Sequence, residues 1–158
     1  MNLRALVADS SGASMHAAAH RTLGAEAIVP VPAFDPYFAA IAAVGAIAVR
    51  VPPRDRFGFP TDAVLRAISP HTRLVYLNTP NNPTGQEISR DDLRAVVEAA
   101  PHALVLVDEA YIEFSTTSFL EELARHRNAV VGRTFSKAYG LAGMRVGCLV
   151  AHPGTLAP

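Results

Sequence analysis

The stretch RTFSKAYGLAGMRVG, residues 133–147, places one lysine among small and hydroxyl-bearing residues, with an arginine eight positions further on. Lys137 follows the hydroxyls of Thr134 and Ser136, and the glycines after it allow a backbone to approach a ligand closely. An amine in an apolar, partly desolvated pocket near another cation can lose its proton and become a nucleophile that forms Schiff bases. Arg145 offers a guanidinium suited to bidentate phosphate binding. The competing interpretation is an ordinary charged residue on a surface loop.

A carboxylate and a phenol follow the aliphatic run ALVLV at residues 103–107. Asp108 would lie at the mouth of a sheet in a poorly solvated place, where a carboxylate is costly unless it is paired. Tyr111, three positions on, can reach the same place. On their own these two residues are better explained as a helix N-cap and a packing residue.

The segment TPNNPTG, residues 79–85, follows the run RLVYLN and combines two prolines with a glycine. Such residues form turns, but this loop is stiffer than a simple connection requires. The side-chain amides of Asn81 and Asn82 can donate to an oxygen. We therefore interpret the segment as a ligand-binding loop.

The segment SSGAS, residues 10–14, directly precedes a helix-like stretch. Free N–H groups at a helix start and the Ser14 hydroxyl could bind an anion, with Gly12 and Ala13 alongside. The motif is weak by itself, because Ser-Gly also forms plain turns and N-caps.

Short aliphatic runs alternate with helix-like stretches along the whole chain. Strands are expected at 26–31, 46–51, 73–78, 103–108, 129–132 and 145–151, and helices at 14–24, 35–45, 61–69, 89–100 and 118–127. Most of the strands are apolar at nearly every position, which is typical of strands covered on both faces. The alternation predicts an α/β fold with three αβα layers and a mostly parallel sheet. Ligands of such sheets lie beyond the carboxyl ends of the strands, where the segments above are found.

Composition excludes several classes of partner. Of the 158 residues, 50% are hydrophobic, and Lys+Arg balance Asp+Glu at 14 each. A neutral chain lacks the basic surplus that nucleic-acid binding requires, and no apolar run approaches the ~20 residues that span a bilayer. Because the single cysteine, Cys148, has no disulfide partner, we expect a buried thiol in a cytoplasmic protein.

Taken together, the strand-end residues complement one cofactor. They offer a phosphate cradle, an amine for an aldehyde, a buried anion and donors for a phenolate-like oxygen. Those are the counterparts of the phosphate, aldehyde, ring nitrogen and hydroxyl of pyridoxal 5′-phosphate. The residues concerned are Gly12, Ala13, Ser14, Ser136 and Arg145 for the phosphate, and Lys137, Asp108, Asn82 and Tyr111 for the rest.

The motifs TPNNPTG, VDEAYIEF and RTFSKAYGLAGMRVG closely resemble fold-type I pyridoxal-phosphate aminotransferases, in particular the histidinol-phosphate and aromatic amino acid subgroup. The resemblance implies that Lys137 forms the internal aldimine and shuttles a proton, and that Asp108 keeps the pyridine nitrogen protonated. It further implies that Asn82 and Tyr111 bond the ring hydroxyl and that Phe34, in VPVPAFDPY, stacks on the ring. Arg145, Ser136 and the Ala13–Ser14 amides would hold the phosphate, beside Thr134.

The resemblance also implies that residues 1–158 are only part of the large domain, without the N-terminal arm and the C-terminal small domain. In the family the small domain supplies the arginine that binds the substrate carboxylate, and the parent proteins are homodimers acting on amino acids and 2-oxo acids. Position 15 is Met15 where the family often has an acidic residue.

Three alternatives remain open at this point. The chain could belong to an active aminotransferase, or it could be a non-catalytic fragment that retains the cofactor cradle. A decarboxylase of phosphorylated amino acids shares the fold and cofactor, although the motifs look more like the aminotransferases. A dinucleotide-binding domain is set aside, since no G-x-G-x-x-G follows any expected strand.

Overall fold

A single sheet of seven strands organises the protein. The computed structural model describes residues 4–9 and 24–155. The strand order is β1-β7-β6-β5-β4-β2-β3. The strands are β1 (Arg4–Asp9), β2 (Glu26–Pro30), β3 (Ile47–Val51), β4 (Thr72–Asn78), β5 (Leu104–Asp108), β6 (Ala129–Thr134) and β7 (Val146–Ala151).

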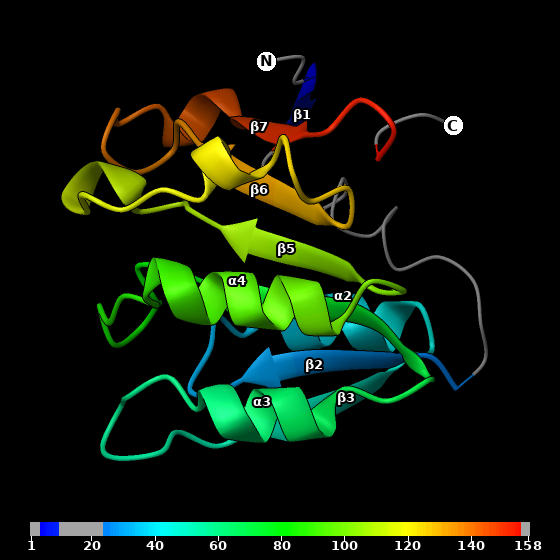
Figure 1. Ribbon diagram of the computed structural model, residues 1–158. Coiled ribbons are helices and arrows are strands. Elements are labelled where there is room, and N and C mark those ends of the chain that lie inside the picture. Colours follow the sequence, from blue (N-terminus) through cyan, green and yellow to red (C-terminus); the bar gives the residue numbers. More distant parts are fainter. Residues whose placement is uncertain (1–3, 10–23, 156–158) are drawn as a thin grey trace.

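The sheet is mostly parallel, as the alternation of strands and helices predicts. Strands β3, β2, β4, β5 and β6 pair in parallel, whereas β7 runs antiparallel to both β6 and β1. The parallel pairs are joined by crossovers that carry α2 (Pro36–Ala43), α3 (Thr61–Ala67) and α4 (Arg90–Ala99). All the parallel strands consequently end at one edge, where the sheet gathers its polar loops (Figure 1).

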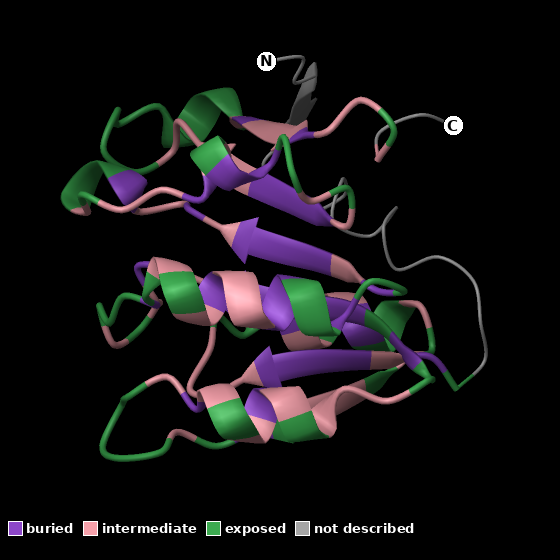
Figure 2. Cartoon of the chain, in the orientation of Figure 1, coloured by how far each residue is buried: buried purple, intermediate pink, exposed green. Residues whose placement is uncertain are grey.

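Helices cover the two faces of the sheet and complete the three layers (Figure 1). Val64 of α3 and Leu93, Val96 and Val97 of α4 belong to the core on one face. On the other face α2 contributes Tyr37 and Ile41 to a second core. The central strands are almost wholly buried between these cores (Figure 2), which explains why their sequences are apolar at nearly every position.

Local sequence signals set the limits of two helices. Ser89 caps α4, since its hydroxyl accepts a hydrogen bond from the Asp92 amide at 3.1 Å. Gly45 lies just beyond α2 with φ of +71°, a left-handed conformation that glycine adopts without strain.

The structure differs from the sequence-based expectations in one helix, one strand and the burial of one cysteine. Residues 118–127 do not form an α-helix: only the 3₁₀ turn η2 (Leu120–Glu122) is present, and hydrogen-bonded turns follow it. Phe119 and Leu123 are fully buried in the core, so tertiary packing overrides the helical preference of this segment. Strand β1 was not predicted, and Cys148 is only partly buried rather than buried. The expected helix at 14–24 lies largely outside the described residues.

Across residues 4–9 and 24–155, no helix is both long and apolar enough to cross a membrane.

Candidate active site

A cleft opens at the carboxyl edge of the sheet, where the parallel strands β4 and β5 end side by side. Asn78 is paired with Asp108 in the register of these strands, and Asp108 is paired with Gly132 of β6. The cleft encloses about 250 Å³ of open space. It is lined by Phe34, Tyr37, Asn78, Asn82, Asp108, Ala110, Tyr111 and Lys137. Five of these residues were singled out from the sequence, and the fold brings all five together.

Asp108 is held by two donors from different parts of the chain. Its Oδ1 accepts from the backbone amide of Ala110 at 3.0 Å, and its Oδ2 accepts a short hydrogen bond from the Tyr37 hydroxyl. Burial raises the pKa of Asp108 above its ordinary value, and this effect outweighs the two hydrogen bonds and the positive charge of Lys137, which lower it. The carboxylate is therefore oriented but short of compensating positive charge.

Tyr37 is a site residue that the sequence analysis missed. It is 2% exposed, it stacks on Tyr76 with ring centroids 4.5 Å apart, and Phe34 meets it edge-on at 5.6 Å. Burial and the neighbouring Asp108 hold the pKa of Tyr37 well above its ordinary value, and they raise the pKa of Tyr76 to about 12. Tyr37 thus stays protonated and donates to Asp108. In the sequence it looked like an ordinary apolar position of a helix.

Removing the Tyr37 hydroxyl should weaken the fold in a pH-dependent way. We expect Tyr37→Phe to lower the free energy of unfolding by about 1.5–3 kcal/mol near neutral pH, the usual loss for a hydrogen bond to a charged group. The loss should shrink as pH falls through the raised pKa of Asp108, because a protonated carboxyl gains less from the phenol. Urea unfolding at several pH values measures this. Tyr139→Phe, at a position 56% exposed, is the control, and a loss independent of pH would contradict the prediction.

Asn78, also missed, joins the ligand loop to β5. Its Nδ2 donates to the Asp108 carbonyl at 3.1 Å and its Oδ1 accepts from the Asn82 amide at 2.7 Å. Asn78 is the last residue of β4, so its side-chain amide lies at the strand end and not in the predicted ligand loop, residues 79–85. Asn81 is committed inside the loop, where its Nδ2 donates to Thr84 and Pro32. Only Asn82 of the predicted pair lines the cleft.

Lys137 lies at the open side of the cleft. Its Nζ is 5.4 Å from the centroid of the Tyr111 ring, a cation–π distance, and the residue is exposed. The expectation of a desolvated lysine is therefore wrong for the described residues. The loop after β6 carries Lys137 over the cleft, and no described segment covers it from outside.

The predicted phosphate-binding residues are not among the residues that line the cleft in the described part of the chain. Thr134 ends β6, and its hydroxyl accepts from the Ser136 amide at 3.1 Å. Arg145 is exposed, has a left-handed backbone with φ of +52°, and donates to the Ala142 carbonyl at 3.4 Å. Gly12, Ala13 and Ser14 lie outside the described residues, so the proposed cradle stays a prediction.

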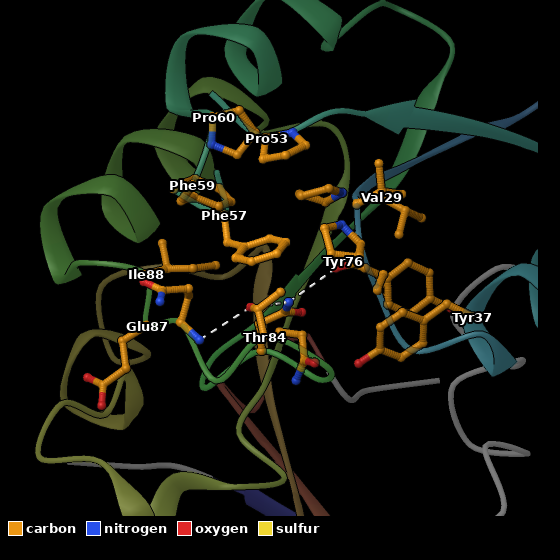
Figure 3. A pocket seen from close by; sticks show the side chains of 18 residues that line it. Val29, Tyr37, Pro53, Phe57, Phe59, Pro60, Tyr76, Thr84, Glu87 and Ile88 are labelled. Atoms are coloured by element: carbon orange, nitrogen blue, oxygen red, sulfur yellow. Dashed lines mark hydrogen bonds between the residues drawn. The ribbon is translucent and has the colours of Figure 1, made fainter. Parts of the chain in front are cut away.

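A larger hollow of about 480 Å³ adjoins the cleft and shares Tyr37 and Asn78 with it. Figure 3 shows Pro53, Phe59 and Pro60 on one side and Val29, Tyr37 and Tyr76 on the other. Its walls are mostly apolar and aromatic. The amine, acid and phenol that could act chemically belong to the smaller cleft, so we place the site there.

The sequence of the chain matches a known family over nearly its whole length. The family model described as aminotransferase class I and II matches residues 4–157. The histidinol-phosphate aminotransferase of Methanococcoides burtonii is 44% identical over 124 residues, which cover 78% of this chain and 34% of that protein. The aromatic amino acid aminotransferase of Rhodococcus erythropolis is 44% identical over 133 residues, which cover 82% of this chain and 37% of that protein. The chain thus spans just over a third of the length of these relatives.

Solved structures share the fold. Histidinol-phosphate aminotransferase from Sinorhizobium meliloti, in complex with pyridoxal-5′-phosphate, superposes with a TM-score of 0.87 at 28% identity, over 96% of this chain and 43% of that one. L-threonine-O-3-phosphate decarboxylase from Porphyromonas gingivalis has a TM-score of 0.77 at 22% identity, over 94% of this chain and 46% of that one. The second likeness bears on the fold alone.

Proposed function

Because the chain belongs to the class I and II aminotransferases, we propose that it holds pyridoxal 5′-phosphate in the cleft at Asp108 and serves amino-group transfer between an amino acid and a 2-oxo acid. The observation that carries the proposal is the convergence of one amine, one carboxylate, two phenols and two side-chain amides on a single aromatic-lined cleft. The relatives are more than twice as long as this chain, so the activity belongs to a protein with their additional segments.

The residues of the cleft fit the cofactor chemically. Asp108 is partly buried and has a pKa raised by burial, so a cationic ring nitrogen placed against it would supply the positive charge that its surroundings lack. Phe34, at 37% exposure, offers a free aromatic face. The Lys137 amine and the Asn82 amide line the same cleft as donors. No residue in this set conflicts with the cofactor.

Each side chain has a task in this proposal. When bound, pyridoxal phosphate supplies an aldehyde and an electron-withdrawing ring. Lys137 Nζ would be the amine that holds the aldehyde, and as a free amine it could move a proton. Asp108 holds a proton at the ring nitrogen, with Tyr37 and Ala110 fixing its orientation. Asn82 and Tyr111 donate to the ring oxygen.

The phosphate would be held away from the ring. We assign Ser136, Thr134 and Arg145 to it, together with Gly12, Ala13 and Ser14. Thr134 ends β6 and Ser136 lies between it and Lys137, and the guanidinium of Arg145 suits bidentate phosphate binding.

The amino donor is proposed from the names of the relatives. Histidinol phosphate or an aromatic amino acid is supported by the curated proteins that are 44% identical to this chain. A decarboxylase of phosphorylated amino acids is a second candidate that the sequence motifs left open; the threonine-phosphate enzyme, at 22% identity, shares the fold and does not favour this activity. A homodimeric assembly and a cytoplasmic location stay predictions.

The test begins with the cofactor and then adds substrates. Purified protein is incubated with pyridoxal phosphate, reduced with borohydride and digested, and we expect one modified peptide containing Lys137. Histidinol phosphate, phenylalanine and threonine phosphate are then offered with 2-oxoglutarate. Glutamate formation supports transfer, and carbon dioxide release from threonine phosphate would support the decarboxylase. A labelled Lys137 without turnover would show that this chain binds the cofactor but that transfer needs the additional segments of the relatives, and no labelling would reject the proposal.

A further inference from the structure

A partly buried ion pair lies next to the cleft, and the side chain of its arginine, Arg133, is 29% exposed. Glu109 follows Asp108 and is 0% exposed, and its Oε2 accepts from Arg133 Nε at 3.1 Å and Nη2 at 2.9 Å. The Phe119 amide donates to Oε1 at 2.6 Å, and the Ser118 hydroxyl lies 3.0 Å from both carboxylate oxygens. Arg133 Nη2 also donates to Ser118 Oγ at 2.9 Å. A carboxylate with no access to water is therefore surrounded by donors from two segments, the end of β6 and residues 118–119.

The hydrophobic core does not require this arrangement. Apolar residues of similar volume often stabilise a buried position as well as an ion pair does, because burying two charges costs most of what their attraction returns. An ion pair instead imposes a geometry, since the planar guanidinium fork accepts a carboxylate in few orientations. The sheet holds its other strands together with apolar residues. The Glu109–Arg133 pair is thus better explained by the fixed orientation that it gives to the two strand ends than by a contribution to the stability of the fold.

The two partners belong to the strand ends that carry the proposed site. Successive residues of a strand point to opposite faces, so Asp108 faces the cleft and Tyr37 while Glu109 faces Phe119 on the other side. Arg133 likewise directly precedes Thr134 and stands four residues before Lys137. The backbone repeats the connection, because the Glu109 amide donates to the Gly132 carbonyl at 2.8 Å.

We propose that the Glu109–Arg133 ion pair is a positioning element of the cofactor site, which fixes the end of β5 against the end of β6 and so sets Asp108 relative to Lys137. The proposal rests on the proposed function, since it concerns the two groups that would contact opposite parts of the cofactor. Glu109 and Arg133 touch no part of the cleft themselves. Ser118 and Phe119 also bind the Glu109 carboxylate, so the same interaction holds the segment before η2 in place.

The test compares this pair with a second ion pair on the same face. Arg133→Lys keeps the charge but loses the fork, and Glu109→Gln keeps the shape but loses the charge. Arg94→Lys is the matched control, because Arg94 Nη2 lies 3.1 Å from Oε1 of Glu122, whose side chain is 8% exposed, on α4 and η2 away from the strand ends. Pyridoxal phosphate affinity, the pH midpoint of the bound-cofactor absorbance and the melting temperature are measured for each protein.

We expect Arg133→Lys and Glu109→Gln to weaken pyridoxal phosphate binding about tenfold or more and to shift the pH midpoint. Both effects are expected because the distance between Asp108 and Lys137 would no longer match the cofactor. Arg94→Lys should lower the melting temperature. It should leave the pyridoxal phosphate affinity within about twofold of wild type and the pH midpoint unchanged, since distant sites act independently. Should the single variants fail to fold, Glu109→Gln/Arg133→Met removes both charges, leaves neither unpaired and should show the same loss of affinity.

Two results would overturn the proposal. If Arg133→Lys and the double variant melted lower yet bound the cofactor with unchanged affinity and pH midpoint, the pair would only stabilise the fold. Wild-type protein that bound no pyridoxal phosphate would overturn the proposed function and this inference with it. Because the wild type is measured first, the two failures are distinguished.

Discussion

Lys137→Ala should abolish covalent cofactor binding altogether. Lys137 is the only lysine in the chain, so no other side-chain amine can replace it. Its Nζ lines the cleft with Asp108 and Tyr111, where an aldehyde would meet it. We expect the variant to lose the absorbance of the linked cofactor and the borohydride-stable label, and any aminotransfer with them. Absorbance spectra and peptide mapping by mass spectrometry measure both losses.

The control for this experiment keeps the charge. Lys137→Arg retains a cation near the Tyr111 ring but supplies a guanidinium that does not condense with aldehydes at ordinary pH. It should retain some non-covalent affinity for the phosphate while forming no label. The α-amino group is the only other amine in the chain, and its peptide is readily told apart. An undiminished label in Lys137→Ala would therefore refute the assignment of Lys137.

Asp108→Asn should have opposite effects on cofactor affinity and on stability. We expect pyridoxal phosphate to bind about 100-fold more weakly, because a charge-assisted hydrogen bond to the ring nitrogen is lost in a partly buried place. Without cofactor, the variant should be more stable than wild type near neutral pH by about 1 kcal/mol, a usual gain when a functional residue is replaced by one its surroundings favour. Titration with cofactor and urea unfolding measure the two effects.

The sign of the stability effect follows from the pKa of Asp108. Burial raises this pKa in the folded protein, so the unfolded chain gives up the proton at lower pH than the folded one. The contribution of Asp108 to wild-type stability is therefore largest at a pH below the ordinary pKa of a carboxyl group, and it decreases as pH rises through the raised pKa of the folded protein. The advantage of Asp108→Asn should vanish in acid and grow toward neutral pH. Asp91→Asn, at a side chain 91% exposed, is the control, and a gain that persists in acid would contradict the prediction.

Much of the site could be predicted because parallel strands end at one edge. Asn82, Asp108, Tyr111 and Lys137 follow three different apolar runs, and the topology places them around one cleft. Phe34 was identified by resemblance, and it lies in the same cleft. These residues could be identified from their positions in the sequence, since a polar residue directly after a buried parallel strand lies at the carboxyl edge of the sheet, where ligands bind.

Other parts of the site could not be predicted because their partners are remote in sequence. Tyr37 meets Asp108 across 71 positions, and Arg133 meets Glu109 across 24. Each looked ordinary locally: one a helix position, the other a strand residue. The failed helix at 118–127 has the same cause, since Phe119 and Leu123 pack into a core formed by residues that are remote in sequence.

The sequence by itself determined the alternation of strands and helices, the mostly parallel sheet and the chemical groups at its carboxyl edge, because apolar runs and the residues that follow them are local features. The tertiary structure decided which of these groups meet: Tyr37 orients Asp108, Asn78 ties the loop to β5, and Lys137 is exposed rather than desolvated. Hydrogen bonding and burial depend on neighbours brought together by the fold, and a chain read residue by residue does not contain those distances.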